Sequence, residues 1–357
     1  MAVSSETVTY STIAAIALDK LSDKIADAIS TANAALYFYK KKGNWEGVAS
    51  GGRQLRKSVL YNLQTVRPIG SFGSVNVNPV DSHTSSYWTW VQTAVPVSFS
   101  DLEEFQTSGS ESIRTIVQAK YQQAKASLDD FMSKAILRGQ ADIDTTSLTT
   151  AITSPTDGST FVDPLGKLIA FDPTASLTVG GLDQSTATYW RNQFTDSSAT
   201  TLGGLLAELR FLHIKCQRGG GGSDKAPDFH LVDERTFAVY ERALALTHRN
   251  PDYNLADIPF NNVVFKKAPV IADELMPDVK NSSTTITDGS WYMCNSAFMG
   301  FTFDKKKSFK IGPNIRPNNQ LVTTALMPVR GTHWTNNRRK LGVLGDIDVS
   351  TLESATS

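Results

Sequence analysis

The four glycines at positions 219–222 suggest chemistry, because glycine-rich loops bind phosphate through their backbone N–H groups. A phosphate-binding loop also needs a Gly-Lys-Ser or Gly-Lys-Thr sequence and a helix directly behind it, and neither follows here. The chain has no Gly-x-Ser-x-Gly sequence to present a hydrolase nucleophile. We therefore interpret the run as a flexible surface loop and expect no catalytic and no cofactor-binding residue.

Histidine and cysteine are common metal ligands, but their spacing in this chain predicts no metal site. The two cysteines, Cys216 and Cys294, form neither a metal-binding motif nor a disulfide framework, so we interpret them as buried free thiols. The histidines are scattered, and none has the spacing of a zinc-binding helix: His83, His213, His230, His248 and His333.

Two short basic clusters, 305–307 with Lys310 and 338–340, have the charge to contact phosphate backbones. No interleaved aromatic residues accompany them, so a solvated or salt-bridging role between subunits is favoured. The adjacent carboxylates Asp129 and Asp130 are interpreted as solvated charges on a helix.

The aromatic group Tyr87, Trp88 and Trp90 belongs to a stretch, residues 53–100, that predicts two long strands joined by a loop. Such a hairpin is too long and too polar at its tip to form a core alone, so it is expected to project. Bulky rings on a projecting hairpin favour a docking surface, although packing within their own chain remains an equal alternative.

The remaining elements predict an α+β protein. Residues 11–42 are predicted to form an amphipathic helix, and residues 108–138 a helix of about 45 Å whose capping box pairs Ser108 with Glu111. Helices and strands are segregated after that, rather than alternating as in a doubly wound sheet. Helices are predicted at 202–215 and 234–249, and strands at 229–232, 263–265, 269–272, 291–295, 298–303, 321–329 and 341–347, before a polar tail.

Composition gives no strong preference for a partner, because 35 basic and 35 acidic side chains leave a formal net charge of zero. No stretch approaches about 18 consecutive apolar residues, so no membrane partner is expected. The first residues have no basic region before their apolar part, which predicts a protein made and kept in a cytoplasm.

The order of these parts resembles the major capsid proteins of tailed bacteriophages, which have the Hong Kong ninety-seven capsid fold. The match is carried by short segments that are weak alone and specific in their order and spacing over nearly the whole chain. They are 86–99 (SYWTWVQTAVPVSF) leading to Gly109, 180–183 (GGLD), 189–191 (YWR), 227–241, 265–270 (FKKAPV) and 293–295 (MCN).

The resemblance implies an N-arm at residues 1–50, an extended E-loop hairpin at 51–100 and a peripheral domain with a long spine helix at 101–145. It further implies an axial domain at 146–320, with peripheral strands late in that span, and a return to the peripheral domain with a C-terminal tail at 321–357. It implies a structural protein that self-assembles into hexamers and pentamers, forming the icosahedral head of a virion around double-stranded phage DNA. An encapsulin-like compartment and, less favoured, an enzyme with an unrecognised hydrolase site are the alternatives.

Departures from the family pattern refine the expected partners. No lysine occurs between Lys57 and Lys120, so covalent cross-linking through an E-loop lysine is not expected. The spine begins too early for a fused scaffolding segment, which implies a separate scaffolding protein, with residues 11–42 as its candidate contact. The family also implies a portal protein at one vertex, possible decoration proteins, non-specific DNA contact and assembly in the host bacterial cytoplasm.

Charged residues at the base of the hairpin complete the expected subunit interface. We expect four cations in this projecting element to pair with acidic side chains of the next subunit. The cations are Arg53, Arg56, Lys57 and Arg67, and the acidic candidates are Glu103, Glu104 and Glu111.

Overall fold

The computed structural model describes residues 41, 45–48, 51–64, 66, 68–73, 78, 80–102, 110–137, 162–218, 226–245, 263–273, 276 and 288–355, and only the backbone of 110–119, 245 and 288. The helix predicted at 11–42 and the capping residue Ser108 lie outside these residues.

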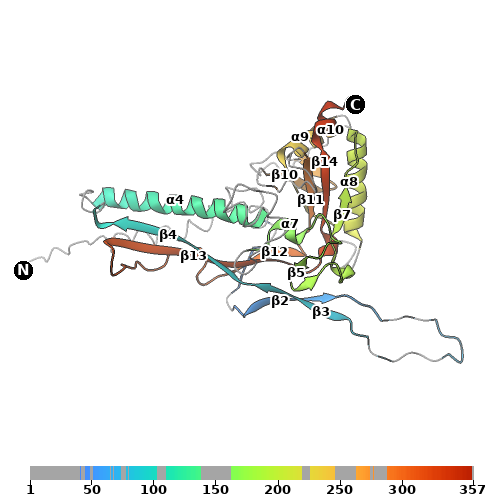
Figure 1. The fold of residues 1–357 in the computed structure, drawn as a ribbon, viewed down its shortest axis with the longest axis horizontal. Coiled ribbons are helices and arrows are strands. Elements are labelled where there is room, and N and C mark those ends of the chain that lie inside the picture. The colour runs from blue at the N-terminus through green and yellow to red at the C-terminus, as the bar shows by residue number, and fades with distance from the viewer. Residues whose placement is uncertain are drawn as a thin grey trace, which may run out of the picture.

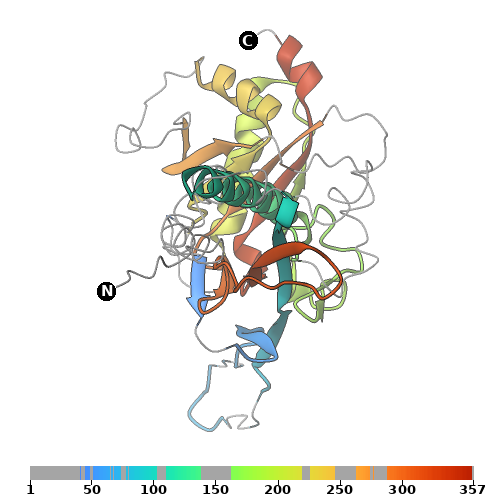
Figure 2. The same cartoon turned by 90° about the vertical axis from the view of Figure 1, so that its left-hand side faces the viewer.

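The molecule is elongated, with two sheets and one projecting hairpin (Figure 1). Helix α4 (Ser110–Leu137) runs along the two long strands β4 (Val91–Ser100) and β13 (Val322–Thr335). A second sheet with its helices stands at one end of this layer, and the hairpin of β2 (Gln54–Leu60) and β3 (His83–Thr89) extends from the same end. Turned by 90°, the hairpin and the C-terminus lie at opposite extremities (Figure 2).

Sheet one has the order β1-β12-β13-β4, with β1 (Trp45–Val48) parallel to β12 (Met299–Asp304). Strand β13 pairs with β4 from Val322↔Ser100 to Gly331↔Val91. The second half of the predicted hairpin, β4, therefore belongs to sheet one, because the whole length of β4 pairs with the 14-residue strand β13. Helix α4 buries one face on this sheet through Tyr121, Ala124, Leu128, Met132 and Ile136.

Sheet two has the order β7-β14-β11-β8-β10-β9. Its strands are β7 (Gln193–Asp196), β14 (Gly342–Asp348), β11 (Asp288–Cys294), β8 (Phe229–Val232), β10 (Ala268–Ala272) and β9 (Val263–Phe265). Helices α8 (Leu202–Gln217), α9 (Glu234–Ala245) and α10 (Val349–Ser354) share a core with one face of this sheet. All four residues of β8 are buried, as in a strand covered on both faces.

The C-terminal part divides between the two sheets. Strand β13 lies in sheet one, whereas β14 joins sheet two. The assignment of residues 321–357 to the peripheral domain with a C-terminal tail stays a prediction. The expected polar tail forms α10, because Asp348 caps it by accepting from the Thr351 N–H at 2.9 Å and Leu352 is buried beneath it.

A bridging segment, residues 163–192, fills the junction between the sheets. It contains α7 (Leu165–Leu168), β5 (Thr178–Val179), β6 (Leu182–Asp183) and the 3₁₀ helix η1 (Thr188–Trp190). Its apolar side chains share one core with the hairpin and with both sheets, including Val59, Trp88, Trp190, Tyr292 and Trp334. The hairpin base and the two sheets therefore meet at a common core.

Several expectations about single residues are settled here. Both cysteines are free and buried, as predicted. Two charge predictions are wrong. Arg338 and Lys340 are fully buried rather than solvated, and Asp129 is buried while Asp130 stays exposed.

Candidate subunit interface

The tip of the hairpin, residues 61–82, exposes large apolar side chains. Strands β2 and β3 pair from Gln54↔Thr89 to Leu60↔His83, and the chain between them carries the tip away from the body. Leu63 is 74% exposed, Val66 92% and Phe72 fully exposed, with Ile69 also exposed. Apolar groups gathered on one projecting element are typical of a surface that binds a protein.

The base of the hairpin is anchored in the chain's own core. Trp88 is 1% exposed, and its indole N–H donates to the Ser86 hydroxyl at 3.1 Å. The prediction that the Trp88 ring docks on a neighbouring subunit is therefore wrong. Burial next to Gly180, over ninety residues away in sequence, satisfies the ring within its own chain.

Lys57 also has an intramolecular position. Its ammonium group lies 3.6 Å from the centroid of the Trp334 ring, on β13. Partial burial lowers the pKa of Lys57, and the charge of Glu46 opposes that shift. Lys57 therefore connects the hairpin to sheet one through a cation–π contact. Because a substitution of Lys57 would disturb this intramolecular contact, it would not test contacts between subunits.

Tyr87 and two arginines remain available at the hairpin surface. Arg53 and Arg56 are exposed, and Tyr87 is 45% exposed with the Arg56 guanidinium 5.8 Å from its ring centroid. The Arg56 Nε–H donates to the Ser85 hydroxyl at 2.8 Å. Trp90 is half-buried, and its buried indole N–H has no hydrogen-bond partner among the described residues.

The other expected interface residues receive no test. Arg67, Glu103 and Glu104 lie outside the described residues, and only the backbone of Glu111 is described, in the first turn of α4. The pairing between these acidic residues and the hairpin cations stays a prediction.

A second exposed apolar group lies at the end of sheet one that is remote from sheet two. There the Asp101 N–H donates to the Leu321 carbonyl at 3.1 Å, and an ion pair joins Arg316 to Asp101. The exposed side chains are Leu102, Ile315, Leu321 and Leu326. We call these four residues the far-end surface.

Sequence reasoning missed the apolar residues of the tip as contact residues. The two long strands predicted within residues 53–100 include Leu63, and the tip was expected to be polar. Val66, Ile69 and Phe72 were therefore not among the predicted contact residues. The available signal was apolar side chains inside a segment punctuated by Pro68, Gly70 and Gly73, where no strand or helix can bury them.

The described part of the chain shows no group of three or more potential metal ligands. His213 and His230 do lie close together, with ring centroids 6.3 Å apart, inside the core beneath α8. Burial lowers the pKa of His230 to about 3, so it is neutral at physiological pH. Within the same described residues, no helix is long and apolar enough to cross a membrane.

Comparison with known proteins gives a likeness in structure. No family model and no curated protein matched the sequence. The structure of the cyanophage A-1(L) capsid asymmetric unit is 12% identical and matches with a TM-score of 0.59 over 85% of this chain and 90% of that chain. The capsid of a native GTA particle is 10% identical, with a TM-score of 0.51 over 86% and 89%. The SrpI encapsulin of Synechococcus elongatus PCC 7942 is 13% identical, with a TM-score of 0.43 over 86% of each chain.

The matches to the cyanophage capsid and to the GTA capsid establish the fold. The chain has an α+β structure of the Hong Kong ninety-seven capsid type, in agreement with the expectation from the resemblance.

Proposed function

We propose that this chain is the major capsid protein of a tailed bacteriophage. It is a structural subunit that self-assembles into hexamers and pentamers and forms an icosahedral head around phage DNA. The observation that carries the proposal, beside the fold, is the hairpin with a buried base and an exposed apolar tip.

The hairpin supplies a contact that each subunit can repeat. A base fixed by Trp88 and Val59 holds the tip away from its own body, so Val66 and Phe72 are covered only when a neighbouring subunit lies beneath them. Each contact need not be large, because closed symmetry repeats it around a ring and over the shell.

The far-end surface supports contacts of a second kind. A ring closes through one head-to-tail contact, whereas a shell also needs contacts that join one ring to the next. The far-end surface is separated from the hairpin by the length of α4, so one subunit can use both at once.

The remaining partners belong to the same proposal. A separate scaffolding protein acts during assembly, a portal protein occupies one vertex, decoration proteins bind outside, and packaged double-stranded DNA is contacted without sequence preference. The protein resides in the virion and assembles in the host bacterial cytoplasm.

The test is assembly of the purified chain, alone and with co-expressed scaffolding protein, followed by sedimentation velocity and electron microscopy. Wild-type chain is expected to give closed shells of uniform diameter. The double variant Val66→Asp, Phe72→Asp is expected to remain folded and unassembled, because charged groups on the tip cannot be buried on a neighbour. Phe211→Asp is the control, since Phe211 is also an exposed aromatic residue but lies on α8.

Two outcomes contradict the proposal: wild-type chain that stays monomeric at every concentration and with scaffolding protein, or tip variants that assemble like wild type. The contents of the particles distinguish a phage capsid from an encapsulin-like compartment. Shells from infected cells contain DNA if the chain is a phage capsid protein. An encapsulin-like compartment would contain protein cargo instead.

A further inference from the structure

The direction of the hairpin is set where it meets the bridging segment. The Tyr87 N–H donates to the Gly180 carbonyl at 2.9 Å. The Trp88 ring lies directly on Gly180, where a Cβ would be 2.9 Å from ring atom Cζ2. The Tyr61 and Tyr189 rings are 5.0 Å apart. The bridging segment is therefore the platform on which the hairpin rests.

This platform has little regular secondary structure: the short helix α7, the 3₁₀ helix η1 and the two-residue strand pair β5–β6. Side-chain hydrogen bonds also hold it, and those of the buried Arg338 reach five of its groups. The Arg338 guanidinium donates from Nε to the Leu168 carbonyl at 2.8 Å, from Nη1 to the Gln184 side chain at 2.9 Å, and from Nη2 to the Asn192 side chain at 3.1 Å. Longer bonds reach the Trp190 carbonyl at 3.3 Å and the Lys167 carbonyl at 3.4 Å.

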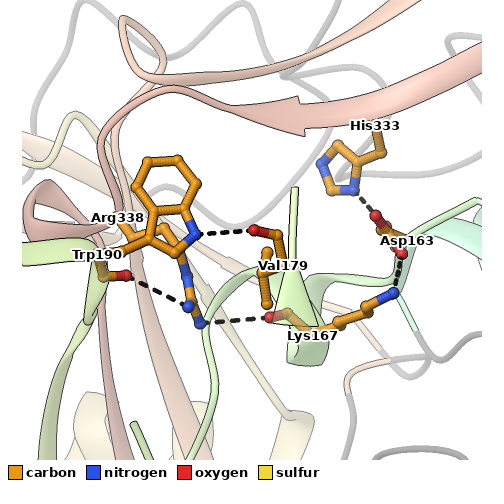
Figure 3. A network of polar contacts seen from close by, with 6 residues as sticks. All are labelled: Asp163, Lys167, Val179, Trp190, His333 and Arg338. Carbon is orange, nitrogen blue, oxygen red and sulfur yellow. Dashed lines mark hydrogen bonds and ion pairs between the residues drawn. The ribbon is translucent and has the colours of Figure 1, made fainter. Parts of the chain in front are cut away.

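Figure 3 shows how these contacts continue through the bridging segment. Trp190, whose carbonyl accepts from Arg338, donates its indole N–H to the Val179 carbonyl at 2.9 Å, one residue before Gly180. At the other side, His333 Nδ1 lies 2.8 Å from the Asp163 carbonyl, and the Asp163 carboxylate pairs with Lys167 at 2.5 Å. The network joins β13 and the segment that holds Arg338 to the bridging segment.

The geometry requires arginine. The five hydrogen bonds of Arg338 end on carbonyl and amide oxygens, and a planar fork with five N–H groups matches them, whereas a lysine ammonium offers three. Burial lowers the pKa of Arg338 to about 9, so it remains charged at neutral pH. Arg338 lies in η3 (Arg338–Lys340), where the chain crosses from sheet one to sheet two.

We propose that Arg338 is a positioning residue for assembly: through the bridging segment it fixes the angle at which the hairpin leaves the body. This inference rests on the proposed function for its biological role. The structural part of the inference is that a buried arginine fixes the direction of the hairpin, and this can be tested in the single unassembled chain. Loss of Arg338 leaves Trp88 on a platform that shifts, and the tip then samples many directions.

The experiment measures hairpin direction in unassembled protein. Spin labels are attached at Asn62→Cys on the tip and Ala207→Cys on α8, both exposed positions, while the native cysteines are buried. Wild type is expected to give one narrow distance distribution by pulsed electron resonance. Arg338→Met is expected to give a distribution of about twice that width, and Arg338→Lys to broaden it as well. Exchange of the Tyr87 amide hydrogen is expected to rise about tenfold or more in Arg338→Met.

Lys340→Met is the matched control. Lys340 is also a fully buried cation of η3, but its ammonium donates to the Gln217 carbonyl at the end of α8, at 2.9 Å, away from the platform. This variant is expected to lose stability and to keep the wild-type distance distribution. The inference is overturned if both Arg338 variants keep the wild-type width, or if Lys340→Met broadens the distribution equally.

If Arg338→Met does not fold, Arg338→Lys decides by the same criterion. The outcome is separable from that of the proposed function. A chain that never forms shells but shows the expected broadening refutes the capsid role alone, whereas a chain that forms shells without broadening refutes the role of Arg338 alone.

Discussion

The Trp88 ring lies against Gly180 with no space for a side chain between them. Gly180 has φ of +60°, and a Cβ there would be 2.9 Å from Trp88 Cζ2 and 3.0 Å from the Ser86 Cβ. This contact joins the hairpin to the bridging segment. Glycine is needed at position 180 for two reasons: it adopts a positive φ without strain, and it leaves room for the Trp88 ring.

Gly180→Ala is expected to lower the free energy of unfolding by about 2–4 kcal/mol, from left-handed backbone strain and the displaced ring together. Gly181→Ala is the control, because Gly181 also has positive φ, +78°, but the nearest atom to its Cβ is Tyr87 Cδ2 at 3.8 Å. It is expected to cost about 1–2 kcal/mol from backbone strain alone. Chemical denaturation measures both, and equal losses would contradict the packing argument.

Charge reversal of Arg53 and Arg56 tests the proposed pairing between subunits. The double variant to Glu is expected to reduce shell yield while thermal stability changes little, because both side chains are exposed. Restoring assembly by Glu103→Arg, Glu104→Arg or Glu111→Arg in the same chain would identify the partner.

Arg210→Glu is the control for that experiment, since Arg210 is exposed on α8, a helix that shares its core with sheet two. Lys57 is unsuitable for the reversal, because its contact with Trp334 would make any loss of assembly a folding effect. Unchanged shell yield with both arginines reversed would exclude the pairing.

The buried His230 predicts sensitivity to acid. Burial and the neighbouring His213 lower its folded-state pKa to about 3, below the ordinary value of 6.5. Between pH 6.5 and 3 the unfolded chain therefore binds a proton at this histidine, whereas the folded chain does not. The free energy of unfolding consequently falls as pH decreases from about 6.5 toward 3. His230→Phe is expected to flatten this fall in a series of melting temperatures, whereas His83→Gln, at an exposed position, should leave it unchanged.

Asp129 predicts the opposite dependence on pH. Burial raises its pKa to about 6, and the charge of Lys125 opposes the shift. The folded chain holds this proton more tightly than the unfolded chain, so stability falls as pH rises from about 4 through 6.

Asp129→Asn is therefore expected to stabilise the protein by about 1 kcal/mol at pH 8 and to change little at pH 3. Asp130→Asn is the control, because the exposed Asp130 pairs with Lys134 at 2.9 Å and contributes only a few tenths of a kcal/mol. Denaturant midpoints at the two pH values provide the measurement. A greater gain at pH 3 than at pH 8 would contradict the assignment.

The sequence by itself determined most of the local structure. Helix α8 was expected at 202–215 and spans Leu202–Gln217, and β8 and β9 have the predicted bounds. The long helix α4 and the projecting hairpin were also foreseen. These elements follow from periodicity, capping and turn residues. Such interactions act between positions a few residues apart, so they can be predicted from the sequence.

Tertiary structure decided which of those elements meet and which charges are buried. Trp88 is covered because Gly180 leaves room for its ring, and Arg338 is buried because the acceptors at Leu168, Gln184 and Asn192 converge on it. The same holds for β4, which pairs with a strand more than two hundred residues later. The residues next to a cation or an aromatic ring in the sequence do not indicate such partners. Whether the side chain is buried depends on groups that only the folded chain brings together.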